Sequence, residues 1–342
     1  MIPLKATRSK NTKVMPTPSQ PADPLGVRES TAFVVERARH VRIDEPAVQH
    51  LAASWAEQGV QAPEWHARYH FFDGTHRAAN WLLALDAVNF SFWSEDPADR
   101  WEIDNQGERL DGYWALAASL SRAVAEGDRP WDAAWLAEME QGDIYRIFRG
   151  KGLIPLIADR LNNLREAGDV LQERYGGQFI NVISAARESA PRLAALVARD
   201  FSSFADIAAY EGRDVRFFKR AQLLVSDIWG AYKGQGWGAF HDMNALTAFA
   251  DYKLPQLLRE HGVLEYSLEL ASEVDSRTLI PWGSPEEVEI WAATVQACER
   301  LHRALAARGV AIPPFQVDWL LWSQAQGQQM TRPYHLTRTI YY

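Results

Sequence analysis

The chain has 342 residues, which is long enough for one large domain or two with a substantial hydrophobic core. Hydrophobic residues make up 47% and charged residues 23%, a balance that excludes a largely disordered or fibrous protein. The formal net charge of −8 argues against a broad, sequence-independent grip on nucleic acid or an anionic membrane, and the single cysteine, Cys298, excludes an internal disulfide framework.

The N-terminal residues 1–23 are predicted to be a flexible tail. They are rich in proline, serine, threonine and basic residues, and they contain no apolar run of the kind found in secretory signals. No later stretch reaches the roughly 18 uninterrupted apolar residues of a membrane span, since even 81–92 is broken by Asp86 and Asn89. We expect one domain over 24–342, no membrane partner and a cytoplasmic location.

The residues after the tail predict an all-α fold in one large multi-helix domain. Asp44 and Pro46 are typical of a helix start, and Val48, Leu51 and Trp55 then recur at helical spacing. No two alternating runs are joined by an Asn-Gly or Asp-Gly turn, so no β-hairpin is expected.

A second helix is predicted from the apolar stripe between Phe217 and Tyr232. The glycines of 234–238 end it. A dinucleotide-binding loop follows a strand and opens a helix, so this glycine-rich segment is interpreted as a flexible loop.

Two helix starts are predicted near the C-terminus. Ser284 and Glu287 flank Pro285 in the pattern of a capping box, and a further short helix is expected to begin at Asp318.

Three histidines, His66, His70 and His76, first suggest a metal site, because the first two are spaced to share one helix face. The segment lacks the glutamate of a metalloprotease motif, and no second ligand cluster follows. We therefore expect no metal and no cofactor, and we interpret the histidines as hydrogen-bonding groups.

A cluster of three cations, Arg216, Lys219 and Arg220, lies at the start of the predicted helix that ends at Tyr232. Backbone N–H groups and the helix dipole would add to a local anion site there. A solvated helix face explains the same pattern, and the two interpretations are equally supported.

Two aspartates lie among aromatic residues. Asp251 follows Phe249 in a segment that reads as a helix running into Pro255, and Asp318 precedes Trp319. Asp318 also suits a helix N-cap. A carboxylate that accepts paired N–H groups beside a stacking ring is what a guanine-like base requires, so both aspartates are candidate ligand-binding residues.

Four sequence blocks resemble the queuosine salvage family: Asn89-Phe-Ser-Phe-Trp93, Phe217-Phe-Lys-Arg-Ala-Gln222, Phe249-Ala-Asp-Tyr-Lys-Leu-Pro-Gln256 and Ile340-Tyr-Tyr342. The likeness extends from about residue 24 to residue 342. It implies an all-helical fold loosely similar to helical DNA glycosylases, and metal-free hydrolysis of the N-glycosidic bond of queuosine 5′-monophosphate. The products would be queuine, which is salvaged for tRNA modification, and ribose 5-phosphate.

The resemblance also implies a base pocket formed by His70, Phe249, Asp251, Asp318 and Trp319, with Asp318 in the position of the catalytic acid. Whether Asp318 acts as nucleophile, cation stabiliser or water-orienting base stays open.

Ser323 is a further expected substrate-binding residue, at a position where some relatives have aspartate, and some have tyrosine in place of Trp319. Lys219 and Lys253 are the candidate cations for the 5′-phosphate.

Three other classes of protein remain as alternatives. A non-catalytic carrier of a 7-deazaguanine nucleotide would need the same pocket, and turnover distinguishes it from an enzyme. A tRNA-binding protein is disfavoured by the net charge and by the absence of a basic stripe, so no direct nucleic-acid partner is expected. A purely structural helical protein leaves the two aspartates unexplained, and the oligomeric state is open.

Overall fold

The computed structural model describes residues 23–249 and 251–342, so the tail predicted for 1–23 lies, apart from Asp23, outside the described residues. The described chain forms fourteen α-helices, short 3-10 turns and three two-stranded antiparallel sheets. The predicted helical fold class is therefore confirmed, with small sheets added. None of the described helices combines the length and the apolar character needed to cross a membrane.

The helices are α1 (Val27–Val35), α2 (Glu45–Glu57), α3 (His76–Ala87), α4 (Gly112–Ala125), α5 (Ala133–Ala137), α6 (Gln141–Ile147), α7 (Ile157–Tyr175), α8 (Phe179–Ala186), α9 (Ala190–Asp200), α10 (Lys219–Ala231), α11 (Lys253–Glu260), α12 (Leu268–Asp275), α13 (Pro285–Ala306) and α14 (Pro314–Gly327). The strands are β1 (Val41–Ile43), β2 (Glu102–Asn105), β3 (Glu108–Asp111), β4 (Ile207–Tyr210), β5 (Arg213–Arg216) and β6 (Leu264–Tyr266), which pair as β1–β6, β2–β3 and β4–β5.

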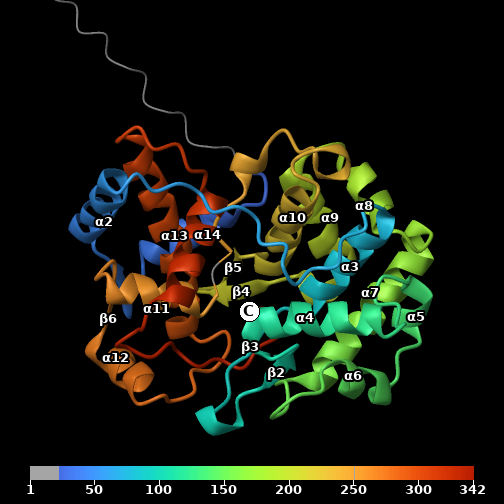
Figure 1. Cartoon of the computed structure of the whole chain (residues 1–342). Helices are drawn as coiled ribbons and strands as arrows, with labels where there is room; N and C mark the ends of the chain where they lie inside the picture. Colours follow the sequence, from blue (N-terminus) through green and yellow to red (C-terminus); the bar gives the residue numbers. More distant parts are fainter. Residues whose placement is uncertain (1–22, 250) are drawn as a thin grey trace, which may run out of the picture.

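The described helices fall into two groups, as Figure 1 shows: α3–α10 lie on the right of the view, and α2 with α11–α14 lies on the left. Each group encloses its own apolar cluster. The long helix α13 takes part in both, because Trp291 and Val295 pack into the first cluster while Ile290 and Ala297 pack into the second. The two groups are therefore joined through a shared buried helix.

The predicted helix starts are largely confirmed. Asp44 caps α2 by accepting a hydrogen bond from Ala47 N at 2.8 Å, and Ser284 Oγ accepts one from Glu287 N at 3.3 Å at the start of α13. The second half of the capping box differs from the prediction, because the Glu287 carboxylate accepts from Gly283 N at 3.0 Å. Each cap satisfies a donor that the first helical turn leaves unpaired.

The expectation of no β-hairpin is wrong at two places. Strands β2–β3 and β4–β5 are each joined by a two-residue turn, made by Gln106-Gly107 and by Glu211-Gly212. All four turn residues have positive φ, between 46° and 88°, as a hairpin turn of this length requires. These turns are difficult to predict from the sequence because glutamine and glutamate replace the usual asparagine or aspartate, and each strand has only four residues.

Candidate active site

A pocket lies where the two helix groups meet, with α10 on one side and α14 on the other. Segments from the first 114 residues and the segment after Leu246 complete its lining. All eight residues predicted for the site line this one pocket: His70, Lys219, Phe249, Asp251, Lys253, Asp318, Trp319 and Ser323. The structure thus brings together residues that are up to 253 positions apart in the sequence.

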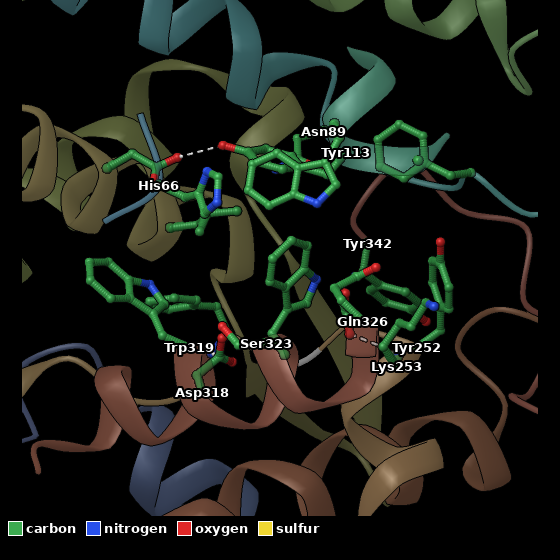
Figure 2. A pocket seen from close by; sticks show the side chains of 18 of the residues that line it. His66, Asn89, Tyr113, Tyr252, Lys253, Asp318, Trp319, Ser323, Gln326 and Tyr342 are labelled. Carbon is green, nitrogen blue, oxygen red and sulfur yellow. Dashed lines mark hydrogen bonds between the residues drawn. The ribbon is translucent and has the colours of Figure 1, made fainter. Parts of the chain in front are cut away.

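Helix α14 supplies a continuous strip of the pocket. Asp318, Trp319, Ser323 and Gln326 follow one another along its inner face, as Figure 2 shows. The helix begins at Pro314 rather than at Asp318 and runs for 14 residues, so the predicted short helix and the N-cap interpretation of Asp318 are both wrong. A proline at the first helical position explains the earlier start.

Asp318 is a buried carboxylate with a single hydrogen bond from the described residues. Its side chain is 5% exposed, and Oδ2 accepts from Phe249 N at 2.9 Å. Burial first, and then the nearby Asp251, raise the pKa of Asp318 well above its usual range, while Lys219 and the Phe249 N–H oppose that shift. Most of its hydrogen-bonding capacity therefore remains available to a ligand.

Asp251 lies in a loop and caps the helix that follows it. Its Oδ1 accepts hydrogen bonds from Lys253 N at 2.8 Å and from Leu254 N at 3.1 Å. The helix predicted to run into Pro255 is therefore wrong, since α11 begins at Lys253 and Pro255 occupies its first turn. Proline is tolerated there because the first-turn N–H groups have no intrahelical partner.

The three cations of the cluster differ in their surroundings. Lys219 and Arg220 are 7% and 1% exposed, so a solvated helix face is the wrong interpretation for these two, while Arg216 is exposed. Arg220 donates to the backbone carbonyls of Asp86, Ala87 and Ser203.

Lys219 instead lines the pocket. Burial lowers the pKa of the Lys219 ammonium, and Asp251 is the strongest of the charges that raise it, followed by Asp86 and Asp318. Lys219 therefore offsets the charge of the carboxylates around it.

His70 lies in the loop before α3, so the shared helix face predicted for His66 and His70 does not form. His70 Nε2 is 2.7 Å from Tyr113 Oη, and its ring packs on Trp65 with centroids 4.6 Å apart. Burial lowers the pKa of His70 to about 4, which keeps the imidazole neutral at pH 7. Within the described residues, no group of three or more His, Cys, Asp or Glu is placed to hold a metal ion.

Aromatic rings form much of the pocket lining. Trp319 packs against Trp229 and Phe315, with ring centroids 6.0 and 5.6 Å away, while Phe249 is 3% exposed. Further rings that the sequence analysis did not single out also line the cavity: Trp65, Phe90, Phe92, Tyr113, Trp114, Tyr252, Trp322 and Tyr342. Some of the fourteen tryptophans thus surround a site suited to a flat ligand.

The opposite ends of the pocket differ in the residues that line them. Figure 2 shows Lys253 and Tyr252 on the right of the view and His66 on the left. Arg100 also lines the pocket, and it pairs with Asp111 at 3.0 Å. Lys253 is affected by the charges of both residues of that pair. Two cations, Lys253 and Arg100, therefore line the pocket together with the acids Asp111 and Asp251.

Asp227 is a buried acidic residue of the pocket that was not predicted from the sequence. It comes from α10, is 4% exposed, and accepts hydrogen bonds from Trp65 Nε1 at 3.0 Å and Tyr113 Oη at 3.5 Å. The helical stripe between Phe217 and Tyr232 omits position 227, so periodicity assigns it to the solvated face. A signal was still present, because Lys219, Leu223 and Asp227 are spaced four apart along one helix face.

Comparison with known proteins assigns this chain to a family. A family model described as queuosine salvage protein matches residues 69–342. The chain is 50% identical over 325 residues to the queuosine 5′-phosphate N-glycosylase/hydrolase of Sphaerobacter thermophilus, covering 95% of this chain and 100% of that protein. Identity is 34% to the proteins of the same name from Bos taurus and Dictyostelium discoideum, which the match covers to 99% and 98%. The resemblance seen in the four sequence blocks is thus confirmed, and the chain belongs to the queuosine salvage protein family.

Proposed function

We propose that the protein hydrolyses the N-glycosidic bond of queuosine 5′-monophosphate and releases queuine and ribose 5-phosphate. The observation that carries the proposal is the buried pair Asp318 and Asp251 in an aromatic pocket. The relatives named above are N-glycosylases/hydrolases of queuosine 5′-phosphate, which supports the same reaction here.

Asp318 is proposed to face the anomeric carbon of the ribose. Breaking the bond from C1′ to the base places positive charge on the sugar ring, and a fixed carboxylate in a water-poor pocket stabilises that charge. Asp318 suits this role because it is buried and accepts only one hydrogen bond from the described residues. The developing cation favours the ionised form of Asp318, against the effect of burial.

The leaving base needs its own stabilisation. Guanine can be protonated at N7, but a 7-deazaguanine has carbon at that position, so hydrogen-bond donors to the six-membered ring and the cationic aminomethyl arm of the base must stabilise the developing negative charge. Asp251 is proposed to recognise the base by accepting from the N–H groups on the pairing edge, with Phe249 and Trp319 against the ring faces. His70 and Ser323 complete the lining around the base and its substituent.

For the 5′-phosphate we propose Lys253. It lines the pocket together with Arg100, and its ammonium is a suitable partner for a phosphate. Lys219 was the second candidate, but its neighbours Asp251, Asp86 and Asp318 suit it better to offset their charge. Lys253 is also affected by Asp251, but Arg100 lines the pocket as well and adds a second cation for the phosphate.

The proposal is tested by incubating purified protein with queuosine 5′-monophosphate, queuosine and guanosine 5′-monophosphate, and measuring released base by chromatography and mass spectrometry. Queuine released mainly from the first substrate is the expected result. Tight binding without release would instead indicate the carrier, which uses the same pocket. The cytoplasmic location and the absence of direct nucleic-acid binding stay predictions from the sequence.

A further inference from the structure

The pocket contains more acidic groups than the proposed reaction has used. Five acidic residues line it: Glu64, Asp111, Asp227, Asp251 and Asp318. Glu64 is exposed and Asp111 is paired with Arg100 at 3.0 Å. Asp251 and Asp318 have roles in the proposed reaction, which leaves Asp227 as the buried carboxylate without one.

The substrate of the proposed function also has one positive group without a partner. Queuosine 5′-monophosphate has three electron-poor regions to which a carboxylate of the protein can bind. They are C1′ in the transition state, the pairing edge of the base and the secondary ammonium of the aminomethyl arm. We infer that Asp227 binds this ammonium and thereby selects substrates that carry the arm. The inference rests on the proposed function, because the arm belongs to that substrate.

The position of Asp227 on α10 supports this assignment. Asp227 is eight residues after Lys219, and at a rise of 1.5 Å per residue the two Cα atoms are about 12 Å apart along the helix axis. Lys219 lies close enough to Asp251 and Asp318 for their charges to raise its pKa. Asp227 accepts from Trp65 Nε1 and Tyr113 Oη, whereas Asp318 accepts from Phe249 N, so the two carboxylates contact different parts of the same cavity lining.

The hydrogen bonds of Asp227 leave room for an additional donor. Oδ1 accepts from Trp65 Nε1 at 3.0 Å, whereas Oδ2 has only the long contact of 3.5 Å to Tyr113 Oη. The short contact of Tyr113 Oη is to His70 Nε2 at 2.7 Å. A carboxylate has about four acceptor positions, so an ammonium N–H can bind Oδ2 without displacing Trp65.

The surroundings of Asp227 also favour a cation. Burial raises its pKa to about 7, against the effects of the Trp65 and Tyr113 hydrogen bonds and of Lys219. An ammonium at Oδ2 would add an opposite charge in direct contact with this buried acid, in addition to the effect of Lys219. The rings of Trp65 and Tyr113, which also line the pocket, present apolar and π surface to the methylene and the cation.

The test compares three nucleotides that differ only in the arm: queuosine 5′-monophosphate, 7-aminomethyl-7-deazaguanosine 5′-monophosphate and 7-deazaguanosine 5′-monophosphate. Asp227→Asn should lower kcat/KM about 10- to 100-fold for the two ammonium-bearing substrates and less than about threefold for the third, as expected for loss of a charged hydrogen bond. An equal loss on all three would make Asp227 a structural residue and overturn the inference.

Two further variants control for effects on folding. Asp227→Glu keeps the charge and should keep the preference for ammonium-bearing substrates. If this variant treats all three alike, the inference fails. Glu289→Gln changes a buried acid that does not line the pocket and binds the backbone N–H groups of residues 39–41, so the ratio of the three kcat/KM values should stay within about twofold of wild type.

Binding measurements separate this inference from the proposed function. Calorimetry with queuine and with 7-deazaguanine should show tighter binding of queuine by the wild type, and loss of that difference in Asp227→Asn. If no base is released but the binding difference holds, the hydrolase proposal fails and the arm site stands. If base is released and the wild type shows no binding difference, the arm site fails and the hydrolase stands.

Discussion

Two groups of buried charged side chains differ in the groups with which they form hydrogen bonds. Arg160 and Arg220 are 0% and 1% exposed, and their guanidinium groups donate to backbone carbonyls. Arg160 binds those of Val88, Phe90 and Ser91. In the pocket, by contrast, Asp318 receives a single hydrogen bond from the described residues. Both groups are buried, but Asp318 lines the cavity and keeps acceptor capacity for a ligand, whereas the two arginines bind the backbone behind it.

This difference separates structural charges from functional ones. The two arginines fix the segment 86–91, which includes part of the first family block and pocket-lining residues. Lys219 and Arg220 are adjacent in the sequence and equally hidden, yet one lines the cavity and the other holds the backbone behind it. The buried arginines therefore support the fold by binding backbone carbonyls, whereas Lys219 and Asp318 are accessible to a ligand because they line the cavity.

The Asp318→Asn variant is the most direct test of the difference between the pocket acids and the structural arginines. The amide keeps the size of the side chain but removes the negative charge, so we expect turnover of queuosine 5′-monophosphate to fall by about 1,000-fold while the Kd for queuine changes little. Steady-state kinetics and calorimetry measure the two quantities. Turnover within about threefold of wild type would remove Asp318 from the chemistry.

Arg220→Met should affect the fold rather than the chemistry. It leaves the carbonyls of Asp86, Ala87 and Ser203 without their donors, so the free energy of unfolding should fall by about 3 kcal/mol. Denaturant titration gives this value. Arg216→Met, at an exposed position of the same cluster, is the matched control and should cost less than about 0.5 kcal/mol. Similar losses in both variants would contradict the structural role.

Lys253→Ala should alter the choice between nucleotide and nucleoside. Loss of a charged contact to the phosphate should lower kcat/KM for queuosine 5′-monophosphate about tenfold and leave queuosine nearly unchanged. Lys151→Ala removes an exposed lysine that does not line the pocket and should leave the ratio as it is. A Lys253 variant that loses activity equally on both substrates would exclude it from phosphate binding.

The smallest effect is expected for Glu287, which is a buried acid outside the pocket. Burial raises its pKa to about 8, so the folded state holds a proton that the unfolded state releases near pH 4.5. Its contribution to stability is full below pH 4.5 and is lost as the pH rises to 8. Glu287→Gln should therefore show a smaller fall in Tm between pH 5 and 8 than wild type. Parallel Tm curves would contradict the raised pKa.

The sequence predicted those parts of the molecule that depend on local pattern. Asp44 and Ser284 cap their helices as expected, because a cap is decided within a few residues. The family blocks contain four of the eight predicted pocket residues, Lys219, Phe249, Asp251 and Lys253, and the wider resemblance to the family supplied the other four. Position 227 could not be found in this way, because α10 is buried on nearly all sides and its polar positions face the cavity or other segments instead of solvent.

The predictions around Asp251 and Asp318 failed for a different reason. Asp251 was predicted within a helix but lies in the loop before α11, and Asp318 was predicted at a helix start but lies inside α14. Prolines decide these boundaries: Pro314 opens α14, and Pro255 is accepted in the first turn of α11. Both aspartates nevertheless line the pocket as expected, because the resemblance to the family depends on residue type and not on helix boundaries.

The pairing of β1 with β6 has a consequence for how the site assembles. Val41 is paired with Tyr266, and α1 packs on α13, so the N-terminal segments are closed onto the last third of the chain. Contacts between such distant residues form slowly, because the long intervening loop must first be ordered. The pocket itself draws on segments from Pro63 to Tyr342. Release of base during refolding would therefore report completion of the whole native topology, and a fragment ending before α14 would be inactive.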